Sequence, residues 1–244
     1  VEIKTGYGLS LESELSHLAV IAALAQSHAC TLLPTLLAAH AVPPEFAGDA
    51  NGYVQMVTQA LIPAAAAWYA TSSIAAQHGA LFCDVFCETG AFDVAQSRAV
   101  LAAGRSQGMT PKLHVDQFHT LGGAALALEM GAISADHLDV TPADERAQLA
   151  ASNTVAVLLP AVNFHMGATQ YADAQAWIAA GGAVALATDF NPGSAPCFSL
   201  PFVMALACRH YGMTPAQALN ACTINAAAAL GIAGRVGSLD VGKE

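Results

Sequence analysis

Residues 183–194 read AVALATDFNPGS, an apolar run that ends at Asp189 and continues into a loop of Asn, Pro, Gly and Ser. The apolar part, residues 183–187, predicts a buried strand, because short apolar runs bounded by turn residues are typical of parallel sheets. A buried strand with an acid at its C-terminal end is how parallel α/β barrels present catalytic groups. The alternative is a strand followed by an ordinary turn, where Asp is common. The rest of the chain bears on this choice.

Strand and helix patterns alternate along the whole sequence. Apolar runs predict strands at residues 1–4, 31–37, 81–87, 112–115, 132–138, 154–159 and 183–187. Helical periodicity predicts helices at residues 9–29, 51–70, 93–107, 121–130, 172–180, 200–211, 215–219 and 225–230. Pro63 is expected to kink or restart the second of these helices. A further helix should open at Thr141 as N-cap with Pro142 at its first position.

This alternation predicts a parallel sheet with helices outside it, either open and doubly wound or closed as a barrel. No GxGxxG motif follows the first strand, which disfavours a dinucleotide-binding fold. A (β/α)8 TIM-type barrel needs eight strands, and seven are predicted here. We therefore expect about seven β/α units of such a barrel, with the first strand missing before Val1, in one hydrolase domain over residues 1–244.

Composition and net charge limit the kinds of partner and the location that are expected for this protein. Of the 244 residues, 55% are apolar and 11% charged, so a large part of the chain should be buried. The net charge is −10 and no Lys/Arg cluster occurs, which argues against nucleic acid and anionic membranes as partners. Polar residues interrupt every long apolar run, so no membrane span is expected. Six scattered cysteines without a CxxC zinc pattern, and the lack of a signal peptide, favour a reduced, cytoplasmic location.

Residues capable of chemistry lie at the ends of the predicted strands. In a parallel barrel these ends meet at one face, so residues distant in sequence can form one site. Taken singly, His40 could be a histidine at the edge of the core, and His137 could pair with the neighbouring Asp136. Together, the His and Asp side chains indicate a metal or acid–base site for Zn²⁺ or Fe²⁺. The strand-end residues are Tyr7, His40, Glu88, His114, His137 and Asp189.

The other histidines carry less information. Those in or near helices are interpreted as surface or packing residues. The two in strand-exit loops are assigned no role. The first group is His17, His28, His78 and His210, and the second is His119 and His165.

Six segments, in this order, resemble the imidazolonepropionases of the metal-dependent amidohydrolase superfamily. They are EIKTGYGL (2–9), AAHAVPPE (38–45), DVFCE (84–88), HVDQ (114–117), SADHL (134–138) and ATDFNPGS (187–194). The resemblance covers the whole chain, and the TDFNPGS loop and the KTGYG turn are its most specific parts.

The resemblance implies a (β/α)8 barrel hydrolase of histidine degradation that opens the ring of 4-imidazolone-5-propanoate to give N-formimidoyl-L-glutamate. It implies one divalent metal, Zn or Fe, bound by His114 and Asp189. Asp189 would also take the proton of the attacking water, and His137 would be catalytic by stabilising the developing oxyanion. The positions that would hold substrate are Tyr7, His40, Gln117, Asn191, Gly193 and Ser194. Gln117 is assigned binding only, because an amide is a poor general base.

Parts of the family pattern do not occur in this sequence. A His-x-His metal pair on the first strand, an upstream substrate-binding arginine and a small β-sandwich are missing. We therefore expect the chain to be a fragment that is inactive alone, and the complete protein to form a homodimer. The alternatives are another amidohydrolase, acting on a cyclic amide or as a purine aminohydrolase, or a non-catalytic barrel segment.

Overall fold

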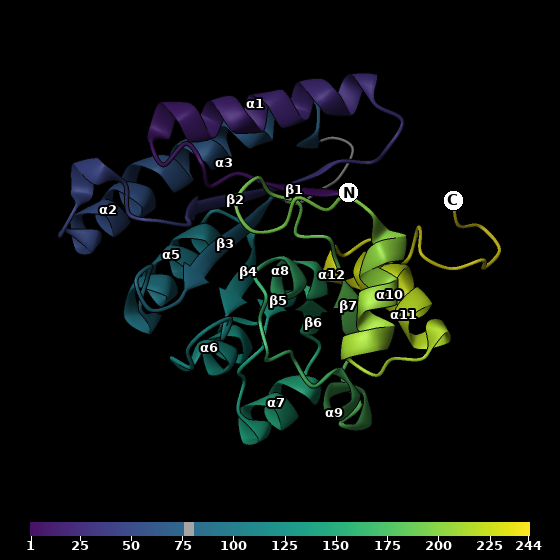
Figure 1. The fold of residues 1–244 in the computed structure, drawn as a ribbon. Helices are drawn as coiled ribbons and strands as arrows, with labels where there is room; N and C mark the ends of the chain where they lie inside the picture. Colours follow the sequence, from purple (N-terminus) through teal and green to yellow (C-terminus); the bar gives the residue numbers. More distant parts are fainter. Residues whose placement is uncertain (76–80) are drawn as a thin grey trace. The chain divides into compact units, whose positions relative to one another are not determined.

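A computed structural model describes residues 1–75 and 81–244, which form two compact units, Val1–His114 and Val115–Glu244. His78 lies outside the described residues. All seven predicted strands are present, and they alternate with helices as the sequence predicts (Figure 1). None of the helices in the described ranges is long and apolar enough to cross a membrane.

The first unit contains strands that pair in parallel in the order of the sequence. Glu2 of β1 is in register with Leu33 of β2, and Thr35 of β2 with Phe82 of β3. Helices α1 and α3 pack against each other, and α1 also packs on β2 (Figure 1). The elements are β1 (Glu2–Lys4), α1 (Leu11–Ser27), β2 (Leu33–Ala39), η1 (Pro44–Phe46), α2 (Ala50–Met56), η2 (Val57–Leu61), α3 (Ile62–Thr71), β3 (Phe82–Cys87), α5 (Val94–Ser106) and β4 (Thr110–Val115), whose last residue begins the second unit.

The second unit repeats the same pattern. Ser134 of β5 is in register with Val155 of β6, and Ala156 of β6 with Val184 of β7, again in parallel. Its elements are α6 (Gly123–Met130), β5 (Ser134–His137), α7 (Ala143–Ala150), β6 (Val155–Leu158), α8 (Pro160–His165), α9 (Ala174–Ala179), β7 (Val184–Leu186), α10 (Leu200–His210), α11 (Pro215–Cys222) and α12 (Ile224–Ala229). A cluster of small and branched apolar side chains from β6, β7, α8 and α12 forms a core.

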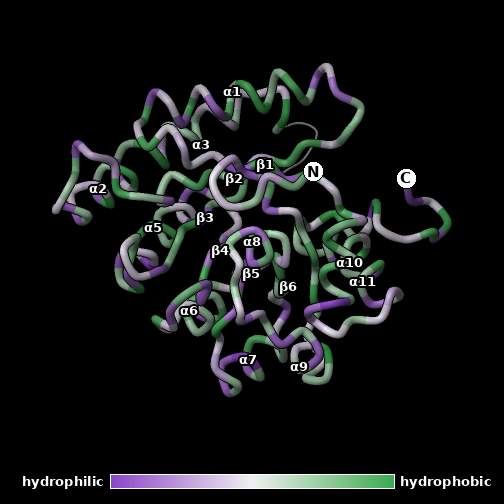
Figure 2. The backbone as a smooth tube through the Cα atoms, in the orientation of Figure 1, coloured by the Kyte–Doolittle hydropathy of each residue, from purple (hydrophilic) through white to green (hydrophobic). Residues whose placement is uncertain are grey.

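Local chemistry explains the helix positions. Ser10 caps α1 by accepting a hydrogen bond from the backbone N–H of Ser13, and Asp93 forms a capping box with Gln96 at the start of α5. The tube of α1 alternates between hydrophobic and hydrophilic residues, as expected for a helix with one buried face (Figure 2). That face includes Leu18 and Ile21.

The break expected at Pro63 is present as a π-helical segment, η2, between α2 and α3. Proline has no N–H to donate to the residue four positions earlier, so the α-helical hydrogen-bond ladder cannot continue through this position. The N–H of Ile62, just before the proline, is bonded to the carbonyl of Val57, five residues earlier.

Several details differ from the sequence-based prediction. Strand β2 lies two residues later than expected. Thr141 does not cap α7, because Pro142 occupies the cap position. The Thr141 hydroxyl instead donates to Asp116 Oδ2 at 2.9 Å. Helix α8 was not predicted, because Pro160 reads equally well as the end of a strand and as the first turn of a helix.

Candidate active site

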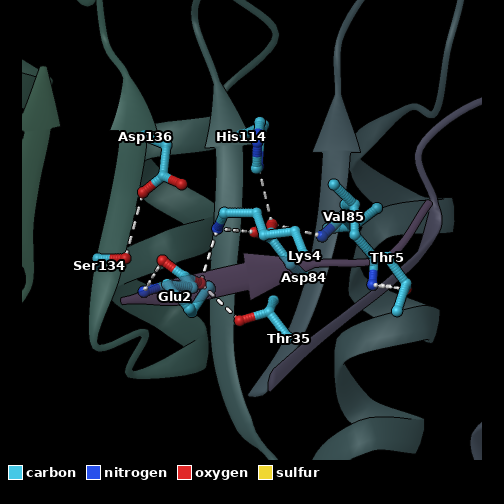
Figure 3. A network of polar contacts seen from close by, with 11 residues as sticks. Glu2, Lys4, Thr5, Thr35, Asp84, Val85, His114, Ser134 and Asp136 are labelled. Carbon is cyan, nitrogen blue, oxygen red and sulfur yellow. Dashed lines mark hydrogen bonds and ion pairs between the residues drawn. The ribbon is translucent and has the colours of Figure 1, made fainter. Parts of the chain in front are cut away.

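The first unit holds a buried carboxylate, Asp84, in the middle of β3. Its Oδ1 lies 3.0 Å from Nδ1 of His114, and its Oδ2 accepts a hydrogen bond from Lys4 Nζ at 2.7 Å (Figure 3). Burial by itself raises the pKa of this carboxyl, but the charges of His114 and Lys4, with their hydrogen bonds, hold the pKa well below its usual range. Asp84 is therefore ionised at neutral pH and fixes the orientation of the His114 ring.

Further charges extend this arrangement along β1 and β4. Glu2 lies 3.0 Å from Lys4, and Thr35 donates a hydrogen bond to the Glu2 carboxylate (Figure 3). Glu2 also lies 3.2 Å from the buried Lys112. The Lys112 ammonium also lies 4.9 Å from the ring centroid of Phe82. Positive and negative groups thus alternate. The attraction between neighbouring opposite charges offsets the desolvation cost of burying them.

His40 and Tyr7 come together at the ends of β2 and β1. Their ring centroids are 5.5 Å apart, edge to face, and His40 Nδ1 lies 3.0 Å from the carbonyl oxygen of Gly6. Because a carbonyl only accepts, Nδ1 carries the hydrogen and Nε2 is left as an acceptor. Burial lowers the pKa of His40, against the opposing effect of the Gly6 hydrogen bond, and a nearby His114 lowers it further. His40 is accordingly neutral at neutral pH.

Phe86 links these aromatic groups. Its ring centroid lies 6.0 Å from that of His40 and 6.2 Å from that of His114. Three of the predicted site residues are therefore linked by ring contacts within the first unit, since Tyr7 contacts His40, and both His40 and His114 contact Phe86.

The turn that carries Tyr7 is held by a single carboxylate. Glu14 of α1 is fully buried, and its two oxygens accept hydrogen bonds from the backbone N–H groups of Gly6, Gly8 and Leu9 at 2.8–3.2 Å. Gly6 has a φ of +107°, and a Cβ at this position would lie 2.7 Å from the carbonyl oxygen of Leu37. The turn therefore requires both the glycine and the acid, and it leaves the Tyr7 side chain 60% exposed.

Glu88, the remaining strand-end residue of this unit, lies just after β3. Its side chain is buried, and its Oε1 accepts a hydrogen bond from the N–H of Thr89 at 2.7 Å.

In the second unit, several strand ends carry non-glycine residues in the left-handed region of φ. His137, the buried last residue of β5, has a φ of +77°, and Leu138 follows at +61°. Asp189, after β7, has a φ of +49°, and Asp116, after β4, has +53°. This conformation is costly for L-residues with side chains, and such residues cluster at functional sites. Two of the four, His137 and Asp189, are residues predicted to be catalytic.

The loop after Asp189 is organised by Asn191. Its Oδ1 accepts hydrogen bonds from the N–H groups of Gly193 and Ser194 at 2.9 and 2.7 Å, and its Nδ2 donates to the carbonyl oxygen of Asp189 at 2.7 Å. Its backbone N–H pairs with the carbonyl of Ala195. The Asn191 amide thus closes the loop onto itself and brings Asp189, Gly193 and Ser194 together.

Gln117, the last of the predicted residues, is half-buried and lines a cavity together with Asp139. Sequence reasoning missed Asp139 as well as Lys4, Asp84 and Glu14. The signal for Asp84 was present, because a charge in the middle of the strand FCDVFC requires a buried partner. Glu14 gave no such signal, since an acid near the start of a helix is common.

Known protein families and curated proteins match this chain. The family model described as "Amidohydrolase family" matches residues 89–244. An imidazolonepropionase of Chloroflexus aggregans is 57% identical over 243 residues, which is 100% of this chain and 57% of that protein. One from Herpetosiphon aurantiacus is 48% identical over 244 residues, again covering 57% of its length. The chain thus spans little more than half the length of these curated relatives.

Solved structures show the same fold at low sequence identity. A triazine hydrolase variant matches with a TM-score of 0.71 and 13% identity, over 100% of this chain and 57% of its own. The guanine deaminase of E. coli matches with a TM-score of 0.69 and 13% identity, over 95% and 56%. A zinc-bound adenosine deaminase of Xanthomonas campestris matches with a TM-score of 0.61 and 19% identity, over 92% and 53%.

These likenesses, and the seven strands that alternate with helices, confirm the prediction of a partial (β/α) barrel. The family match covers more than half of the residues and includes β4 to β7. The chain belongs to the amidohydrolase family.

Proposed function

We propose that the protein hydrolyses the ring amide of 4-imidazolone-5-propanoate to N-formimidoyl-L-glutamate in the cytoplasm, as a step of histidine degradation. The observation that carries this proposal is the similarity to curated imidazolonepropionases along the entire chain, at 57% and 48% identity. The grouping of Tyr7, His40 and His114 in the first unit and the strained Asp189 loop in the second support it.

We propose that His114 and Asp189 hold a divalent metal, Zn or Fe, because imidazole and carboxylate are ligands that both ions accept. His114 would bind through Nε2, since its Nδ1 faces Asp84 at 3.0 Å. A carboxylate that fixes the ring of a ligating histidine in this way is common around metal ions. When bound, the metal lowers the pKa of a coordinated water towards neutrality.

Two residues of the second unit would move the proton and stabilise charge. Asp189 accepts a proton from the attacking water through its carboxylate and passes it to the ring nitrogen that leaves. His137 donates a hydrogen bond to the oxyanion that forms at the attacked carbonyl. The strained backbone at both residues is the kind of feature that holds side chains in a fixed, prepared geometry.

The remaining predicted residues would hold the substrate. Neutral His40 offers Nε2 as an acceptor for a ring N–H, and exposed Tyr7 offers its hydroxyl. Gln117 is proposed to hydrogen-bond the ring. Because the Asn191 amide is engaged within its own loop, we propose that it acts mainly by placing Gly193 and Ser194 beside the substrate.

The test is to express the full gene product, follow the loss of imidazolone absorbance and identify N-formimidoyl-L-glutamate by mass spectrometry. Guanine and adenosine serve as alternative substrates, because deaminases share the fold. Turnover of the imidazolone alone supports the proposal, and turnover of a purine instead would replace it with an aminohydrolase. No turnover of any of the three would favour a non-catalytic barrel. Light scattering on the same sample tests the proposed homodimer.

A further inference from the structure

A cavity of about 350 Å³ lies in the second unit, among residues that follow the C-terminal ends of β5 and β6 and the end of β4. Its walls combine apolar side chains, such as Phe118 and Met166, with polar ones. Gln117, already proposed to contact substrate, and Asp139, which has no role so far, both line it.

Asp139 is buried, and only one of its two carboxylate oxygens accepts hydrogen bonds from the described residues. Its Oδ1 accepts hydrogen bonds from Asn163 Nδ2 at 2.6 Å and from the N–H of Ala172 at 3.1 Å. Its Oδ2 accepts none from the described residues, and Asp139 is one of the residues that line the cavity. The carboxyl is therefore fixed in place with one oxygen available to a ligand.

Among the described residues that line the cavity there is no Lys or Arg, and the one histidine is His119. The charge of Asp139 raises the pKa of Tyr171 and of Tyr211, in both cases after the larger effect of burial. Burial raises the pKa of Asp139 itself to about 7, against the hydrogen bonds from Asn163 and Ala172.

We propose that this cavity binds a small organic cation with N–H groups, of the amidinium type, through Oδ2 of Asp139. Such a cation supplies both the charge and the hydrogen bond that the carboxylate lacks, and its flat, weakly hydrated face suits the apolar walls. The side-chain oxygen of Gln117 can accept a second N–H. A divalent metal ion fits less well, because it prefers several oxygen ligands and Asp139 is the sole carboxylate in the described lining.

The proposed reaction creates such a group, and this step of the inference rests on the proposed function. Opening the imidazolone ring breaks the amide C–N bond, adds the oxygen of water to the carbonyl carbon, which becomes a carboxylate, and leaves both former ring nitrogens in a formamidine. At neutral pH that formamidine is protonated. The cavity would then hold the cationic end of the product.

The first experiment uses acetamidinium chloride as probe and measures its binding to the 244-residue chain by calorimetry at constant ionic strength. Saturable binding is expected at pH 8. At pH 6 the affinity should be about tenfold weaker, because the carboxyl is then mostly protonated. Tetramethylammonium, which has the same charge but no N–H, should not bind.

Asp139→Asn should abolish binding at both pH values, whereas Asp144→Asn, the same change at an exposed position of α7, should leave it unchanged. Carbon NMR of the wild-type carboxyl provides a readout without a variant, since saturating acetamidinium should lower the pKa of Asp139. The proposal is overturned if acetamidinium does not bind at pH 8, if folded Asp139→Asn binds it equally, or if the carboxyl titration does not move.

The product assignment has its own readout. N-formimidoyl-L-glutamate should inhibit the full gene product, and Asp139→Asn should weaken that inhibition at least tenfold. Unchanged inhibition overturns the assignment to product. Failure of the full gene product to open the ring overturns the proposed function, while acetamidinium binding would still support the cation site.

Discussion

At the scale of single residues, Asp189 combines a carboxylate, half-burial and a left-handed backbone at a strand end. We predict that Asp189→Asn in the full gene product lowers kcat by at least about 100-fold, because loss of a general base alone typically costs this much. The fold should survive, since Asn also tolerates a positive φ. Steady-state kinetics and circular dichroism measure the two effects, with Asp144→Asn as control. Activity within tenfold of wild type would mean that Asp189 is structural.

Tyr7 is exposed and lies edge-on to His40. Replacing it with Phe should raise KM for the imidazolone more than it lowers kcat, because lost uniform binding appears mainly in KM. Tyr53→Phe is the matched control. The hydroxyl of Tyr53 is buried and donates to the carbonyl of Ala38 at 2.8 Å, so its loss should cost stability by about 1 kcal/mol and leave KM unchanged. An unchanged KM in Tyr7→Phe would remove Tyr7 from the substrate site.

Contacts between single residues show which parts of the site could be predicted from the sequence and which could not. The pairing of Tyr7 with His40 follows from two strand ends, of which the pattern placed the end of β2 two residues too early. The contacts of Asp84 with Lys4 and His114 could not be derived, because they join side chains 80 and 30 positions apart whose register is set by strand pairing. The positive φ values at His137 and Asp189 are likewise invisible in a residue pattern.

At the scale of elements, the turn between β1 and α1 depends on Gly6. Gly6→Ala should lower the midpoint of thermal unfolding strongly, because it combines an unfavourable φ with a Cβ placed 2.7 Å from the Leu37 carbonyl oxygen. Gly48→Ala isolates the first effect, since Gly48 has a φ of +83° and open space around it. We expect a cost of about 1 kcal/mol for Gly48→Ala and clearly more for Gly6→Ala. Equal costs would show that the contact with Leu37 relaxes freely.

The positions of strands and helices were predicted from the sequence more accurately than the contacts between side chains. All seven strands and most helices follow from apolar periodicity and from Gly and Pro signals, with errors of up to three residues at the ends. The misses have physical causes. The residue pattern predicts Thr141 as the N-cap, but the helix begins one residue later, with Pro142 at that position. Helix α8 is short, and its single proline is equally typical of a strand end.

At the scale of the whole molecule, the pH dependence of stability should contain a term from Asp139. Its pKa is about 7 in the folded protein and near 3.9 in the unfolded chain, so the folded state holds more protons between these values. Stability from this group is present below about pH 4 and is lost as the pH rises through 7. Asp139→Asn removes the effect.

We therefore expect the unfolding free energy of Asp139→Asn, relative to wild type, to increase by about 2–3 kcal/mol from pH 5 to pH 8. Urea titrations at the two pH values measure it, and all other ionisable groups cancel in the difference. A difference that is the same at both values would show that Asp139 titrates normally.

The buried Glu14 has a consequence for the mutational tolerance of the chain. One side chain satisfies the N–H groups of three residues in the turn, so its length and its two acceptor oxygens are both required. In a saturation library, position 14 should reject even Asp and Gln, although it lies in the first turn of a helix where acids are usually interchangeable. The neighbouring Glu12, which is exposed, should accept almost any residue. Fitness scores would then single out a helix position that never touches the substrate.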